Sequence, residues 1–198
     1  MQETGTRINK YMSQCGYCSR READRLIEKG EVWINGTLAT MGTKVMPGDT
    51  VMVHHTTITP CQKEYLLAFH KPAGIVCTTS KIDKNNVIDY LNFPERIYPV
   101  GRLDKESTGL LLLTNNGQLM DDVLRGSNYH EKEYIVHVNK PITDSVLQAM
   151  AQGVPILDTI TRPCKIRRMG KDCFYITLTQ GLNRQIRRMC EYFDYRVT

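Results

Sequence analysis

The sequence predicts an α+β fold in two parts, a small N-terminal module and a larger domain whose mixed, largely antiparallel sheet is flanked by helices. Strand and helix signals are interleaved without the strict alternation that a parallel sheet needs. Residues 55–64 are polar and lack steady periodicity, which is typical of a linker. With 198 residues, 41% of them hydrophobic, the chain can bury the core of a small module and a medium domain. We therefore expect domains at 1–54 and 65–198.

Two short helices and a small sheet are expected in the N-terminal module. Residues 7–13 read as a helix that ends at Gly16. The second helix starts at Ser19, which stands three residues before Glu22 in capping-box spacing, and Gly30 is placed to cap its end. The remaining signals are the apolar stripe Ala23, Leu26 and Ile27, strands at 32–34 and 50–53, and the type I′ hairpin pair Asn35-Gly36.

The larger domain shows strand and helix signals in irregular order. Asn115-Asn116-Gly117 marks a turn before one of its helices. This order favours an α+β sheet over a doubly wound one. Strands are expected at 65–70, 97–100, 110–114, 134–138 and 173–179, and helices at 86–91, 118–124 and 144–152.

Several classes of protein are excluded by the composition. No stretch approaches the run of about 20 apolar residues that a membrane helix needs, and the N-terminus lacks an apolar signal core. Seven cysteines at irregular spacings suit free thiols in a reducing cytoplasm better than a disulfide framework. We expect a cytoplasmic protein, most simply a monomer, without a membrane partner.

Motifs for metals and small-molecule cofactors are also missing. The sequence has no phosphate-binding loop, no dinucleotide fingerprint and no H-E-x-x-H motif. Cys15-x-x-Cys18 is half a zinc site, and no second pair follows to complete four ligands. We expect neither a metal nor a cofactor, which argues against a zinc-knuckle module.

The positive charge is concentrated at the C-terminal end. The net charge is +5, and the last 38 residues carry nine Lys or Arg against three acids. Such a block suits a polyanionic partner such as nucleic acid. On charge alone, an ordinary solvated surface explains it equally well.

The N-terminal module resembles the S4 RNA-binding domain over about residues 6–53. Arg7-Ile8-Asn9-Lys10, the run from Cys18 to Asp24, Gly30-x-Val32 and Asn35-Gly36 carry the resemblance. It implies that the two helices rest on structured RNA. The alternative is that their cations are surface charges paired with neighbouring carboxylates. The implied phosphate contacts are Arg7, Lys10, Arg20, Arg21 and Lys29.

The larger domain resembles the pseudouridine synthases through four motifs in their expected order. Gly101-Arg102-Leu103-Asp104 is similar to the family's central motif, whose aspartate is catalytic. Lys71-Pro72-x-Gly74 matches its first motif, Lys132-Glu133-Tyr134 the segment with the active-site tyrosine, and the run 183–189 the third motif. The resemblance implies Asp104, Tyr134 and Arg187 as catalytic residues. Taken alone, Asp104 could be a turn cap and Tyr134 a core residue of a strand.

Within this family the chain resembles the RsuA/RluB/RluE/RluF branch, and stretches such as Gln180–Arg187 look most like the RluF type. The resemblance implies a uridine in a stem-loop of large-subunit (23S) rRNA as substrate, with a tyrosine-tRNA anticodon loop as a second one. The domain of such enzymes continues beyond the segment matching 195–197, so we expect C-terminal strands to be lacking here. A rival reading is a non-catalytic S4-type RNA-binding or ribosome-associated protein. Further RNA contacts are expected at Lys71, Arg102, Arg184 and Arg188.

Overall fold

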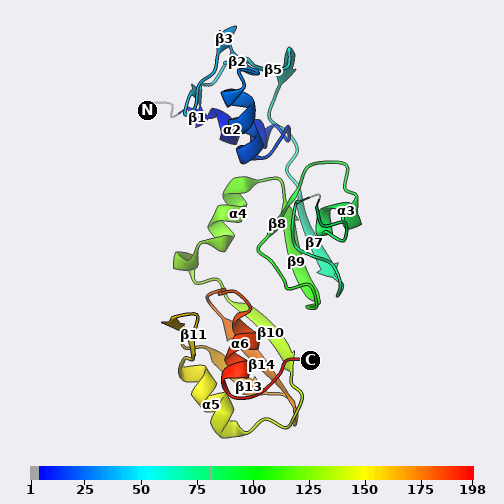
Figure 1. Ribbon diagram of the computed structural model, residues 1–198, viewed down its shortest axis with the longest axis vertical. Helices are drawn as coiled ribbons and strands as arrows, with labels where there is room; N and C mark the ends of the chain where they lie inside the picture. Colours follow the sequence, from blue (N-terminus) through cyan, green and yellow to red (C-terminus); the bar gives the residue numbers. More distant parts are fainter. Residues whose placement is uncertain (1–4, 81) are drawn as a thin grey trace. The chain divides into compact units, whose positions relative to one another are not determined.

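The computed structural model describes residues 5–80 and 82–198 (Figure 1). The chain forms two compact units that divide between Met120 and Asp121, inside helix α4 (Gly117–Leu124). Each unit has hydrophobic clusters of its own. Among the described residues, no helix is long and apolar enough to cross a membrane.

The first unit begins with two helices and two small sheets. Helices α1 (Ile8–Gln14) and α2 (Arg20–Glu28) share a core with an antiparallel four-stranded sheet in the order β3-β2-β5-β6. The buried side chains include Met12, Ala23, Val32, Val51 and Val53. The sheet strands are β2 (Val32–Ile34), β3 (Thr37–Leu38), β5 (Val51–Val53) and β6 (Thr56–Ile58), while β1 (Thr6–Arg7) pairs with β4 (Lys44–Val45).

Both ends of α2 form as the sequence predicts. The Ser19 hydroxyl oxygen accepts the Glu22 N–H at 3.1 Å. At the other end Gly30 has φ +73°. The N–H of Gly30 donates to Ile27 O and that of Glu31 to Leu26 O, both at 3.0 Å. These two bonds make a Schellman cap, which satisfies carbonyls that the helix leaves free.

Two hairpins in this sheet turn over two residues with positive φ. Asn35 (φ 50°) and Gly36 (φ 81°) join β2 to β3, as the Asn-Gly signal predicts. His54 (φ 46°) and His55 (φ 65°) join β5 to β6, and His55 stacks on Trp33 with ring centroids 5.5 Å apart. Strand β6 thus lies inside the segment expected to be a linker, because two histidines in a tight turn carry no sequence signal for a hairpin.

The rest of the first unit is built on a further antiparallel sheet, in the order β7-β9-β8. Its strands are β7 (Leu66–Lys71), β8 (Tyr98–Val100) and β9 (Gly109–Thr114), and α3 (Val87–Leu91) packs with it (Figure 1). The Asn86 side chain caps α3 by accepting the N–H groups of Ile88 and Asp89 at 3.0 and 2.9 Å. Cys77, Val87, Ile97, Leu111 and Leu113 form the buried cluster.

The second unit is a three-stranded antiparallel sheet covered by two helices. The sheet order is β10-β14-β13, with β10 (Lys132–His137), β13 (Lys165–Arg168) and β14 (Cys173–Leu178). Phe174 and Ile176 on β14 pack in a core with Met150 of α5 (Asp144–Gln152) and Met189 of α6 (Gln185–Tyr192). A 3₁₀ turn (Gly126–Asn128) and the hairpin of β11 (Pro155–Ile156) and β12 (Thr159–Ile160) complete the unit.

These observations confirm the α+β class, and every named strand ladder among the described residues is antiparallel. Several elements were not expected, among them strand β13 and helix α6. Strand β13 reads Lys-Ile-Arg-Arg and lacks a clear apolar alternation. Helix α6 begins after Arg184 in the left-handed region (φ 50°), without a side-chain cap to mark its start.

Candidate active site and RNA-binding surface

Asp104 lies in the loop between β8 and β9 and is half-buried. The loop leaves β8 through Gly101, whose φ of +86° suits a residue without Cβ. The carbonyl of Asp104 accepts the Ser107 N–H at 3.1 Å, which closes a tight turn. The following Gly109 returns the chain to β9. A short loop between two paired strands therefore carries the carboxylate.

Lys71, at the end of β7, is fully buried beneath this loop. Its ammonium Nζ donates to Pro72 O at 2.8 Å, Lys105 O at 3.2 Å and Ser107 O at 2.8 Å. An ammonium has three N–H groups, so these carbonyls use all of them. Burial lowers the pKa of Lys71, opposed by Cys77 and by the carboxylates of Glu106 and Asp104. We expected Lys71 to contact RNA, but this position fits a role in holding the loop.

Two more contacts join the segment after β7 to the same loop. The Gly74 N–H donates to Lys105 O at 2.7 Å, and the Leu103 N–H points to Cys77 Sγ at 3.4 Å. Leu103 also packs against the neighbouring core. The two stretches that resemble the first and central family motifs are thus one hydrogen-bonded structure. Arg102, between Gly101 and Leu103, is exposed.

The other two predicted catalytic residues belong to the second unit. Tyr134 lies in β10, opposite Ile176 of β14, and is half-buried against the core. Arg187 lies in α6, half-buried, with Nη1 3.5 Å from Val197 O. Because Asp104 belongs to the first unit, its pairing with Arg187 stays a prediction.

The turn before α6 presents two more predicted RNA contacts. Arg184 is exposed at the start of the helix. Arg188 donates from Nε to Asn183 O at 3.0 Å and from Nη2 to Asn183 Oδ1 at 3.3 Å. The buried Gln185 Oε1 accepts the Leu182 N–H at 3.0 Å. These bonds fix the backbone on either side of Arg184.

In the S4 region, helix α2 carries one arginine that is ion-paired and two that are exposed. Arg25 forms an ion pair with Glu22 at 3.0 Å, and Asp24 accepts a hydrogen bond from Asn9 at 2.8 Å. Arg20 and Arg21 are exposed in the first turn of the helix and form no ion pair with the described residues. Two of the carboxylates that the surface-charge alternative requires, Glu22 and Asp24, are thus engaged elsewhere. Among the other predicted contacts, Arg7 and Lys29 are exposed and Lys10 is half-exposed.

Two cation–aromatic pairs in the second unit were not singled out from the sequence. The Arg162 guanidinium lies 4.5 Å from the Tyr129 ring centroid and donates to Gly126 O at 3.2 Å. The Arg167 guanidinium lies 4.1 Å from the Tyr175 ring centroid. Arg162 and Tyr129 are distant in the chain and meet only in the fold, whereas Arg167 and Tyr175 lie opposite each other in the β13–β14 hairpin. Arginine paired with an aromatic ring is common where proteins bind RNA.

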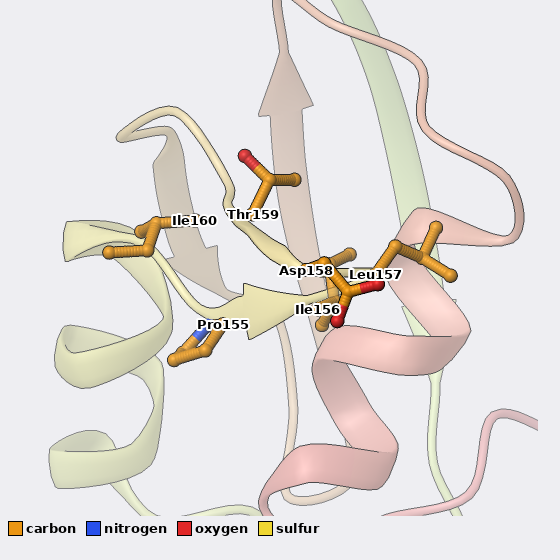
Figure 2. A pocket seen from close by; sticks show the side chains of 6 residues that line it. All are labelled: Pro155, Ile156, Leu157, Asp158, Thr159 and Ile160. Carbon is orange, nitrogen blue, oxygen red and sulfur yellow. The ribbon is translucent and has the colours of Figure 1, made fainter.

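The β11–β12 hairpin forms a shallow pocket that is lined by Pro155 to Ile160 (Figure 2). None of the predicted catalytic or RNA-binding residues lines it. Its turn residues Leu157 and Asp158 have φ of 49° and 57°. We assign this pocket no role in the chemistry.

Metal ions in proteins are most often held by His, Cys, Asp and Glu side chains. Within 5–80 and 82–198, no group of three or more His, Cys, Asp or Glu side chains is arranged to hold a metal ion. Burial raises the pKa of Cys15 to about 11 and also raises that of Cys18.

Comparisons with known proteins agree with the two resemblances. Residues 65–192 match the family model described as RNA pseudouridylate synthase, and residues 6–51 match the S4 domain. The dual-specificity RNA pseudouridine synthase RluF of Salmonella typhi is 54% identical over 198 residues, covering 99% of this chain and 68% of that protein.

Two proteins of lower sequence identity are also similar to this chain. The ribosomal large subunit pseudouridine synthase B of Bacillus subtilis is 32% identical over 201 residues, covering 96% of this chain and 82% of that protein. A crystal structure of a pseudouridylate synthase superposes with a TM-score of 0.68 at 25% identity, covering 98% of this chain and 85% of the other.

Proposed function

Because the chain belongs to the RNA pseudouridylate synthase family, we propose that it isomerises one uridine in a stem-loop of large-subunit (23S) rRNA, and a second in the anticodon loop of tyrosine tRNA. The name "dual-specificity" of the relative that is 54% identical supports two RNA substrates. The loop of Asp104, tied to a buried lysine, is the observation that carries the catalytic assignment. We infer an S4 domain at 1–54 and a catalytic domain at 65–198, acting as a cytoplasmic monomer.

The reaction needs only a carboxylate and groups that position it. The bond from the ribose to N1 of uracil breaks, the base turns, and carbon 5 bonds to the ribose. Carbon 5 then loses its proton and N1 gains one, so the net change is an isomerisation. No electron or group is supplied from outside. Ionised Asp104 either attacks the substrate or removes a ribose proton at the start of this sequence.

The target base must leave its helix to reach Asp104. Flipping a nucleotide out of a stem costs a few kcal/mol, and less in a loop. Arg102 is exposed two residues before Asp104, so its side chain is free to fill the vacated space. Its guanidinium would stack on the neighbouring bases and offset part of that cost.

Arg187 and Tyr134 would act on the carboxylate and the base. A guanidinium forms two parallel hydrogen bonds with a carboxylate, which keeps the carboxylate charged where water is excluded. The Tyr134 ring would stack on uracil, with its hydroxyl near carbon 5 for the late proton removal. Both side chains are half-buried, which suits groups at the edge of a core that meets substrate.

Release of tritium from carbon 5 of labelled uridine tests the proposal directly. The full chain is incubated with transcribed rRNA stem-loops and with tyrosine tRNA, and counts released to solvent are measured. We expect near-stoichiometric release from one uridine in each RNA. Tight binding of both RNAs without any release would instead support the non-catalytic RNA-binding protein.

A further inference from the structure

In the second unit, two further metal-ligating side chains lie close to the thiol of Cys173. Cys173 of β14 lies directly opposite His137 of β10, with Sγ 3.5 Å from Nε2. Its Sγ also lies 3.6 Å from the Sδ of Met169, at the start of the β13–β14 turn. The core residues Phe174 and Ile176 share one face of β14, so Cys173, next to Phe174 in the strand, points to the opposite face.

The turn that carries Met169 is held firmly. The N–H groups of Met169 and Gly170 both donate to Cys173 O, at 3.0 and 2.9 Å. Arg168 donates from Nη1 to Gly170 O at 3.1 Å and from Nη2 to Ile142 O at 2.7 Å. The next two carbonyls, of Lys171 and Asp172, accept N–H groups from the segment after β10 at 3.0 and 2.9 Å. The backbone that carries the Met169 thioether is therefore held in place.

The three side chains differ in how far they are exposed to solvent. Cys173 is buried, whereas His137 and Met169 are exposed, the latter by 53%. A ligand can therefore approach from solvent between the two exposed donors and reach the thiol below. None of the three takes part in the isomerisation, and none belongs to the buried clusters.

We propose that Cys173, His137 and Met169 form a three-coordinate binding site for Cu(I). Thiolate and thioether sulfur select Cu(I), and imidazole also suits it. Zinc sites draw on Cys, His and carboxylates, not on methionine. Taking the zinc bond lengths of about 2.0 Å to nitrogen and 2.3 Å to sulfur as a guide, a trigonal ion separates its donors by about 3.7–4.0 Å. Cys173 Sγ now lies 3.5 Å from His137 Nε2 and 3.6 Å from Met169 Sδ, so each distance needs to lengthen by only a few tenths of an ångström.

Binding is a simple exchange of a proton for the metal ion. The Cys173 S–H bond breaks, its proton leaves to solvent, and an S–Cu bond forms while copper stays Cu(I). Burial raises the pKa of Cys173, so the metal replaces a proton rather than binding a free thiolate. The thiolate–Cu(I) pair carries no net charge, which suits a buried position without a counter-ion.

Cys164 provides a matched control in the same unit. It is half-buried, burial raises its pKa to about 11, and its Sγ lies 3.9 Å from Met150 O. It is thus a shielded thiol whose described contact is a backbone carbonyl. A difference in Cu(I) binding between Cys164→Ser and Cys173→Ser isolates the contribution of the histidine and methionine neighbours of Cys173.

The test is anaerobic titration of the full chain with Cu(I) in competition with bicinchoninate. We expect Cys173→Ser to lose one tight equivalent and Cys164→Ser to lose none. Met169→Leu and His137→Asn keep all thiols, and each should weaken that equivalent at least about tenfold. Wild-type Cu(I) affinity in both of these variants would overturn the proposal, because the thiol alone would then bind.

A second measurement avoids dependence on the folding of any one variant. Ag(I) replaces Cu(I), and the methyl resonances of ¹³C-labelled methionines are followed by NMR in the wild-type chain. The Met169 methyl should shift on saturation, while the buried Met150 methyl should stay in place. An unmoved Met169 resonance, or a preference for Zn(II) that Met169→Leu leaves unchanged, would rule out the site.

Discussion

The loop that carries Asp104 and helix α2 of the S4 region both depend on cations, but they place them in opposite ways. Lys71 is fully buried, and its ammonium donates to three carbonyls and so holds the loop in place. Arg20 and Arg21 are exposed and form no ion pair with the described residues, so their charge is available to RNA. The contrast suggests that the first region serves reaction rate and the second serves affinity.

Removing the carboxylate should have the largest effect. Asp104→Asn keeps the size of the side chain and abolishes its charge, so tritium release should fall by about 10⁴-fold or more, below detection. RNA affinity should stay within about threefold, because the exposed cations dominate binding. Release at the wild-type rate would return Asp104 to the role of a turn cap.

Lys71→Met tests whether the buried ammonium serves rate. Three carbonyls would lose their donor, at a cost of about 1–3 kcal/mol for each that stays unpaired. The displaced loop should lower kcat by about 10²-fold, with little change in RNA affinity. Exposed Lys105→Met in the same loop is the control and should keep a wild-type kcat. A loss of affinity in Lys71→Met at unchanged kcat would contradict this division of roles.

Arg187→Lys distinguishes charge from geometry in the second unit. Lysine keeps the charge but not the planar pair of donors, so kcat should fall about tenfold without being abolished. In Arg187→Ala kcat should fall further, since the positive charge is lost together with the planar pair of donors. Single-turnover rates on a minimal stem-loop measure both variants. If Arg187→Ala reacted as fast as wild type, the ion pair with Asp104 would be wrong.

The double variant Arg20→Ala, Arg21→Ala tests the affinity side of the comparison. The slope of log K against log salt should flatten by about 1.4–1.8, for two lost phosphate contacts. The rate at saturating RNA should hardly change. Arg25→Ala removes a cation already paired with Glu22 and should alter the slope much less. Equal slopes in the double variant and wild type would show that α2 does not lie on RNA.

The smallest effect is expected at the β11–β12 turn, which belongs to neither region. Asp158 has φ 57°, and the second position of such a turn favours glycine. Asp158→Gly should raise the free energy of unfolding by about 0.5–1 kcal/mol, as measured by urea denaturation. RNA binding and kcat should both stay at wild-type values, which makes this variant a baseline for the others.

Local chemistry was enough to predict much of this chain. The ends of α2 follow from Ser19 and Gly30, because a cap needs only residues adjacent in sequence. The Asn35-Gly36 hairpin follows for the same reason. The placement of Asp104 in a loop between strands was also expected from the glycines around it. Strand β6 and helix α6 were not predicted from the sequence, because His54, His55 and Arg184 adopt positive φ although they are not residue types that usually do so.

Tertiary structure decided what each polar side chain does. In the sequence Lys71 belongs to a family motif and was predicted to contact RNA, and only the fold brings three carbonyls to its ammonium. The three donors Cys173, His137 and Met169 are unremarkable in the sequence until antiparallel pairing sets two of them opposite each other. The sequence alone determines local backbone preference and the motifs of a family. Hydrogen bonding and burial between distant residues depend on strand register, which is set by long-range packing.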